Sequence, residues 1–164
     1  VPRGTAGELA VGAEDPGLFL GYWRAEDETR AKLRDGWFLT GDTALMENDG
    51  AIRYLGREDD MLNAGGFRVS PLEVERAFDA HPGVQESAAV ELTLRAGVSV
   101  TGLFYVPRTA PLSDDELAVH AQATLARYKQ PRLYIATDSL PCGANKKLNR
   151  RWLRENWHAP APGP

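Results

Sequence analysis

The most constraining feature of this chain is an uninterrupted run of signals from Gly56 to Glu75. An acidic cluster (58–60), a glycine pair (65–66), the lone Arg68 and a helix start (70–73) follow one another without a gap. Glycines allow backbone conformations that other residues avoid, and charged side chains beside them can meet a ligand and then move away. The run therefore favours a swivel beside an anionic ligand over ordinary core packing.

Composition predicts a packed domain. The chain has 164 residues, of which 43% are hydrophobic and 26% charged, enough for one domain or two small pieces. The net charge of -4 argues against a nucleic acid or an anionic membrane surface as partner. We expect no membrane span, because no apolar run approaches the roughly 20 residues that one needs.

Cysteine and histidine usage narrows the chemistry further. Cys142 is the only cysteine, so no internal disulfide can form and a reducing, cytoplasmic location is expected. The three histidines lack metal-ligand spacing, so no metal site is predicted. The chain opens at Val1 without Met and without the apolar core of a signal peptide, which we interpret as the start of a piece of a longer protein.

The first part of the chain predicts a β-rich segment with one short helix. Residues 8–11 have strand character, and 26–34 have helical composition. Strands at 43–47 and 51–55 flank Asn48-Asp49-Gly50, which is typical of a three-residue hairpin loop.

The composition changes near residues 58–61, where we place a domain boundary. A capping box with proline at the first helical position, Ser70-Pro71-Leu72-Glu73, predicts a helix that closes at 81–83. The other expected elements are strands at 87–92, 100–106 and 133–136, a helix capped by Ser113, a helix over 147–157 and a frayed tail from 158.

The candidate site residues each have a plain alternative. Asp42 follows a glycine and could accept both hydrogen bonds of a ribose diol, or could bond to its own turn. Arg57 could bind the same ribose or a phosphate, or could pair with Glu58 or Asp59.

The second group of candidates lies further along the chain. Gly65-Gly66 lets a backbone approach a ligand closely, although the G-x-G-x-x-G fingerprint is absent. Arg68 could bind a phosphate, or could pair with Glu73 or Glu75. In Lys146-Lys147, a mobile cation could bridge anionic oxygens in a transition state, or the pair could be an ordinary solvated helix start.

The order of these motifs resembles the adenylate-forming (AMP-binding) ligases, which include acyl-CoA synthetases, peptide-synthetase adenylation domains and luciferases. The resemblance runs from Gly7 to about Trp157. The motifs that carry it are Thr40-Gly41-Asp42, Gly56-Arg57-x-Asp59-Asp60, Gly65-Gly66-x-Arg68, Pro71-x-Glu73-Val74-Glu75, Tyr128-Lys129-x-Pro131 and Leu140-Pro141 leading to Lys147.

The resemblance implies an α+β fold and a division of the chain. Residues 1–58 would be the β-rich end of the large adenylation domain. Residues 59–164 would be the mobile C-terminal domain, with a three-stranded sheet, a β-hairpin and flanking helices.

The resemblance also implies site roles. Asp42 and Arg57 would hold the ribose of ATP, Arg68 its phosphates, and Asp59 would be the hinge. Gly65 and Gly66 would line the pantetheine tunnel of CoA, and Lys147 would be the catalytic lysine. The family commonly has glycine before that lysine, where this chain has Lys146, so a shift of one residue stays open.

The implied reaction is that of an acyl-CoA synthetase. A carboxylic acid attacks Mg-ATP to give acyl-AMP, and CoA then takes the acyl group. We expect this chain alone to be inactive, because the phosphate loop and the acyl pocket belong to an absent N-terminal domain. Alternatives are an enzyme that loads a carrier protein, or a non-catalytic nucleotide-binding or interaction module. The acid itself is not predicted.

Overall fold

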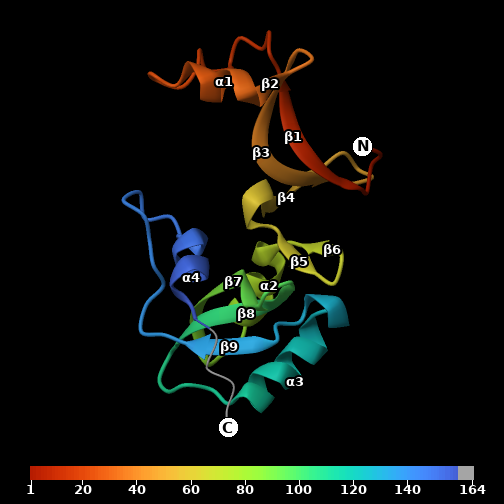
Figure 1. Ribbon diagram of the computed structural model, residues 1–164. Coiled ribbons are helices and arrows are strands. Elements are labelled where there is room, and N and C mark those ends of the chain that lie inside the picture. Colours follow the sequence, from red (N-terminus) through yellow and green to blue (C-terminus); the bar gives the residue numbers. More distant parts are fainter. Residues whose placement is uncertain (159–164) are drawn as a thin grey trace. The chain divides into compact units, whose positions relative to one another are not determined.

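The computed structural model describes residues 1–158, and the predicted tail beyond His158 lies outside the described residues. The chain divides into two compact units, Val1–Asp59 and a second that begins at Asp60. Figure 1 labels the helices and strands of both units.

The first unit is built around one antiparallel sheet. β1 (Ala6–Gly12), β2 (Leu33–Arg34) and β4 (Ile52–Arg57) all pair with the long β3 (Trp37–Met46). The β3–β4 hairpin confirms the predicted loop, in which Gly50 has φ +90°. The helix α1 (Glu26–Lys32) is shorter than predicted, because Leu33 and Arg34 leave it to pair with β3.

The second unit begins at Asp60, the last residue of the 3-10 turn η1 (Glu58–Asp60), and is an α+β domain, as predicted. Its strands are β5 (Leu62–Ala64), β6 (Phe67–Val69), β7 (Val84–Arg95), β8 (Val98–Pro107) and β9 (Leu133–Ala136). Its helices are α2 (Pro71–Asp79), α3 (Asp114–Thr124), the 3-10 turn η2 (Arg127–Lys129) and α4 (Arg150–Asn156). β5 and β6 form a hairpin, and β7–β8–β9 form a three-stranded sheet in which β9 runs parallel to β8.

The three-stranded sheet has a packed layer on each face. Successive strand residues point to opposite faces, so β7 and β8, apolar at consecutive positions, are buried on both sides. One face, with Ala89 and Leu103, packs on α2 and α3, while the other, with Val90 and Phe104, packs on Leu153 of α4 (Figure 1). This construction holds α2 and α4 against the same strand, β7.

Two details of the predicted helices are wrong. Ser70 precedes α2 as expected, but its side chain makes no cap hydrogen bond to the helix, and Glu73 instead accepts a hydrogen bond from Lys129. The last helix begins at Arg150 rather than at Lys147, because Asn149 caps it through the backbone N–H of Trp152. In both places a partner distant in sequence or a better cap outweighs the local pattern.

In the part of the chain that the structure describes, no helix is both long and apolar enough to cross a membrane.

The β7–β8–β9 sheet is packed too tightly at Gly102 to accept a side chain. A Cβ at this position would lie 2.3 Å from Cδ1 of Leu92, a side chain that is 1% exposed. We predict that Gly102→Ala lowers the free energy of unfolding by about 1–3 kcal/mol through overpacking. Chemical denaturation of Gly102→Ala, Leu92→Val and the double variant checks this. The double variant should recover part of the loss, and losses that simply add would contradict the steric explanation.

Candidate functional site

Asp42 and Arg57 meet at the end of the first unit. They are direct partners in the β3–β4 register, and Arg57 Nη1 lies 3.3 Å from Asp42 Oδ1. The same Nη1 donates to the backbone oxygen of Thr40 at 3.2 Å, and the Tyr54 hydroxyl lies 3.5 Å from Asp42 Oδ1. The carboxylate of Asp42 therefore faces a cationic fork and a phenol rather than an amide of its own turn.

Gly41 makes this arrangement possible. Its φ is +77°, and a Cβ there would lie 2.9 Å from Nη2 of Arg57 and 3.0 Å from Nζ of Lys32. Its backbone N–H donates to Glu8 Oε1 at 3.0 Å, and the neighbouring Thr40 hydroxyl donates to the backbone oxygen of Leu9. Glycine at this position thus leaves room for the side-chain ends of Arg57 and Lys32.

Arg57 also lies close to Asp59, the last residue of the first unit. Its Nε is 3.6 Å from Asp59 Oδ1, and the side chain of Asp59 is 76% exposed. Burial alone would lower the pKa of Arg57, but the charges of Asp42 and Asp59 outweigh that effect and raise the pKa. The guanidinium is therefore a permanent cation between two carboxylates.

Gly65 and Gly66 form the turn of the β5–β6 hairpin. Their φ angles are +60° and +89°, in the region where glycine is favoured, and added Cβ atoms would meet nothing within 4 Å. Arg68 lies on β6, opposite Asn63 of β5. Both carboxylates considered as its partners have other contacts.

Those contacts are made by Lys129 and Arg150. Glu73 accepts a hydrogen bond from Lys129, and Glu75 forms an ion pair with Arg150. Burial alone would lower the pKa of Lys129, but the hydrogen bond and charge of Glu73 outweigh it and raise the pKa.

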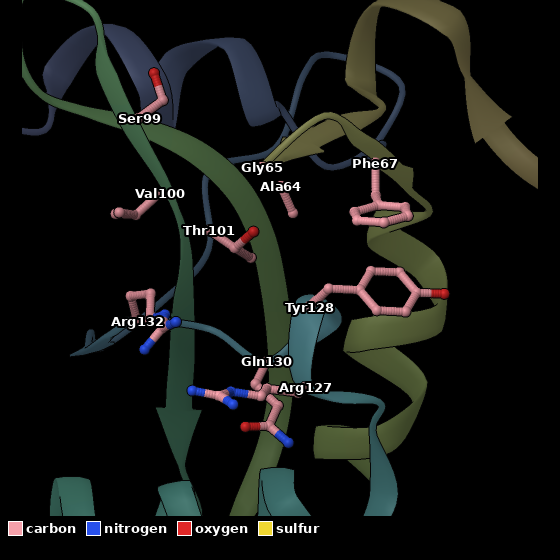
Figure 2. Close-up of a pocket in the computed structure, with 10 residues that line it drawn as sticks. All are labelled: Ala64, Gly65, Phe67, Ser99, Val100, Thr101, Arg127, Tyr128, Gln130 and Arg132. Carbon is pink, nitrogen blue, oxygen red and sulfur yellow. The ribbon is translucent and has the colours of Figure 1, made fainter.

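A hollow of about 510 Å³ opens beside the hairpin turn (Figure 2). Its volume falls within the range of small-molecule sites, roughly 300–1,000 Å³. One side carries the rings of Phe67 and Tyr128, whose centroids are 4.8 Å apart, and Figure 2 shows Arg127 and Arg132 on the other. The hollow is also lined by Ala64, Gly65, Ser99, Val100, Thr101 and Gln130. It offers an aromatic platform and two cations.

Lys147 is exposed on a loop that ends at α4. The loop closes by an isolated β-bridge between Cys142 and Leu148, and the N–H of Gly143 donates to the oxygen of Lys147 at 2.8 Å. Lys146 has φ +59°, an uncommon conformation for a side chain other than glycine. The strained residue thus stands directly before Lys147.

A largely buried charge cluster includes the first residue of α4, the helix at which this loop ends. It consists of Asp60, Glu75, Arg150 and Arg154, and we name it the Arg150 cluster. Arg150 Nη2 lies 2.7 Å from Glu75 Oε2, and Arg150 Nη1 lies 3.4 Å from Asp60 Oδ2. Burial raises the pKa of Glu75, against the opposing effect of its hydrogen bonds from Arg150 and from the N–H of Ala89.

The structure thus groups the predicted residues into separate places. Asp42, Arg57 and Asp59 lie together in the first unit. In the second unit Gly65, Gly66 and Arg68 share one hairpin, and Lys147 lies on another loop. Among the described residues there is no group of three or more His, Cys, Asp or Glu side chains arranged to hold a metal.

Sequence reasoning missed the Arg150 cluster and most of the hollow. Arg127 and Arg132 flank the Tyr128-Lys129-x-Pro131 motif, so that motif was the available signal for the hollow. No local pattern pairs Asp60 with Arg150, because the two are distant in the sequence.

This chain is similar to a known protein family and to several known enzymes. Residues 73–147 match the family described as the AMP-binding enzyme C-terminal domain. A long-chain-fatty-acid–CoA ligase of Escherichia coli O6:H1 is 37% identical over 155 residues, which are 94% of this chain and 27% of the relative. A 4-chlorobenzoate–CoA ligase of an Arthrobacter species is 40% identical over 158 residues, 94% of this chain and 30% of the relative.

Solved structures agree. The o-succinylbenzoate CoA synthetase of Bacillus subtilis, in complex with its acyl-adenylate intermediate, superposes with a TM-score of 0.86 at 29% identity, covering 98% of this chain and 32% of that protein. An ATP-bound enzyme from Rhodopseudomonas palustris gives 0.83 at 33% identity, with 94% and 31% covered. The chain spans less than a third of the relatives' length. The resemblance drawn from the motifs is confirmed: the chain belongs to the adenylate-forming ligases and carries their C-terminal region.

Proposed function

We propose that this chain is the C-terminal part of an ATP-dependent acyl-CoA synthetase. The whole enzyme would convert a carboxylic acid and ATP to acyl-AMP and pyrophosphate, and would then form the CoA thioester. The observation that carries the proposal is the ion pair of Asp42 with Arg57. Arg57 lies two residues before Asp59, where the first unit ends, and the chain's relatives are CoA ligases. A large N-terminal domain would supply the rest of the site.

Asp42 and Arg57 would hold the ribose of ATP. An ionised carboxylate offers only acceptors, which suits the two donor hydroxyls of a ribose diol. The ion pair with Arg57 orients the carboxylate of Asp42, and the remaining donors of Arg57 can reach a ribose or phosphate oxygen. Arg68 would contact the ATP phosphates.

Lys147 would stabilise the transition state of adenylation. An ammonium on an exposed loop can bridge the attacking carboxylate and the α-phosphate, where negative charge develops. The φ of +59° at Lys146 supports this register, because the family's glycine precedes its lysine and only glycine takes such an angle without strain.

CoA would bind at the hairpin turn and the hollow beside it. The exposed backbone of Gly65 and Gly66 admits a narrow pantetheine arm, since no side chain stands there. The paired rings of Phe67 and Tyr128 suit the adenine, and Arg127 and Arg132 suit the CoA phosphates.

Asp59 would be the hinge between residues 1–58 and 59–164. Rotation there would bring Lys147 to the active centre for acyl-AMP formation, and would then replace it with Gly65 and Gly66 for thioester formation. Mg²⁺ would enter with ATP, held by its phosphates. The acid stays unassigned, because relatives that act on a fatty acid and on 4-chlorobenzoate match this region with similar identity, 37% and 40%. A cytoplasmic location stays a prediction.

The ribose assignment predicts a loss of sugar discrimination. In the full-length enzyme, Asp42→Ala should reduce the preference for ATP over 2′-deoxy-ATP by about 10- to 100-fold, because a hydrogen bond to a charged group contributes about 1.5–3 kcal/mol. The ratio of kcat/KM for the two nucleotides measures this. The matched control is Asp49→Ala, which removes the hairpin-loop carboxylate that accepts a hydrogen bond from the N–H of Ala51. An unchanged preference in Asp42→Ala would refute the assignment.

The lysine assignment predicts that the two neighbouring lysines behave differently. Lys147→Ala should slow acyl-AMP formation by roughly 10²–10³-fold, the usual cost of losing one electrostatic stabiliser, and should largely spare thioester formation from supplied acyl-AMP. Lys146→Gly should keep both activities, since glycine relieves the left-handed backbone. ATP–pyrophosphate exchange and thioester assays measure the two steps. A selective loss in Lys146→Gly with an active Lys147→Ala would move the assignment by one residue.

A further inference from the structure

The Arg150 cluster joins the two ends of the second unit. Asp60 is the first residue of that unit, and Arg150 is the first residue of its last helix, α4. The side chains of Arg150, Asp60 and Glu75 are 13%, 19% and 8% exposed, so the interaction takes place largely out of water. Charges in such a setting are held in fixed geometry, because breaking one pair leaves a buried charge without compensation.

Arg150 directly continues the loop that carries Lys147. The N–H of Asn149 donates to the oxygen of Pro141 at 2.8 Å, which closes the base of the loop, and the Asn149 side chain caps α4. Leu148 packs into the same apolar cluster as Leu153 of that helix. Any displacement of Arg150 is therefore passed to the base of the loop.

Asp60 links the start of the second unit to α4. Its Oδ2 lies 3.4 Å from Arg150 Nη1, and its Oδ1 lies 3.4 Å from Arg154 Nη1. On the preceding side of Asp59, the Thr43 hydroxyl donates to Glu58 Oε2 at 2.9 Å. The chain is thus anchored immediately before and immediately after Asp59, which confines a rotation to that residue.

We propose that Arg150 is a positioning residue for Lys147. Through Asp60 and Glu75 it makes the start of the second unit, α2 and the base of the Lys147 loop into one rigid body. Rotation at Asp59 then delivers the ammonium of Lys147 to a fixed place. The proposal rests on the proposed function, and it adds a residue that acts on the lysine without touching the substrates.

The test separates the two half-reactions in the full-length enzyme. Arg150→Lys keeps the positive charge but loses the planar fork that serves Glu75 and Asp60 together. We expect acyl-AMP formation to slow by about 10- to 100-fold, the cost of a misplacement near 1 Å. Thioester formation from supplied acyl-AMP should change by less than about threefold, because that step does not use Lys147. Arg151→Lys, on an exposed pair with Glu155 in the same helix, should change nothing.

A second variant covers the case in which Arg150→Lys fails to fold. Asp60→Asn removes one charge at the hinge end, and it should show the same selective loss. In the double variant the losses should not add, because both residues act through one contact. Thermal unfolding midpoints are recorded for every variant.

Equal slowing of both half-reactions, or no slowing in either variant, would overturn the positioning role. A loss that follows the unfolding midpoint would overturn it as well. If the unmodified full-length enzyme shows no carboxylate-dependent ATP–pyrophosphate exchange, the proposed function itself fails, and that outcome is distinct.

Discussion

The bidentate pairing of Arg150 with Glu75 is the interaction on which the second unit most depends. Glu75 also accepts the N–H of Ala89, so one carboxylate links α2, β7 and α4. Burying such a pair is costly, as the raised pKa of Glu75 reflects. The cost brings a fixed geometry around Asp60 and the Lys147 loop, where an apolar contact would allow sliding.

Backbone conformation does much of the remaining work. Gly41, next to Asp42, leaves room for the side-chain ends of Arg57 and Lys32, and Gly65 and Gly66 leave an open turn. Lys146 takes a similar left-handed angle without being glycine. At each place, a side chain that we propose for binding or catalysis lies within a few residues of a backbone conformation that ordinary residues avoid. Local strain of this kind is characteristic of functional sites.

Local signals predicted the fold well, and distant contacts explain what they missed. The hairpin at Asn48-Asp49-Gly50, the Ser113 cap and the strand β9 all follow from nearby residues. The order of the motifs predicted the family and named Asp42 with Arg57, which the structure brings together. Sequence patterns carry no information on which distant charges pair. The sequence therefore could not predict that Asp60 contacts Arg150. Nor could it predict that Glu73 accepts a hydrogen bond from Lys129 instead of completing a capping box.

In the proposed enzyme, one hinge residue would serve both half-reactions. Proline at position 59 would fix the φ angle there and restrict the backbone conformation of Glu58. The hydrogen bond between Thr43 and Glu58 and the ion pair between Asp60 and Arg150 would stay in place. The most direct measurement is therefore the rate of acyl-AMP formation and the rate of thioester formation in full-length Asp59→Pro. A hinge at Asp59 predicts that one rate falls strongly while the other is kept, whereas equal loss of both rates, or loss of neither, would contradict it.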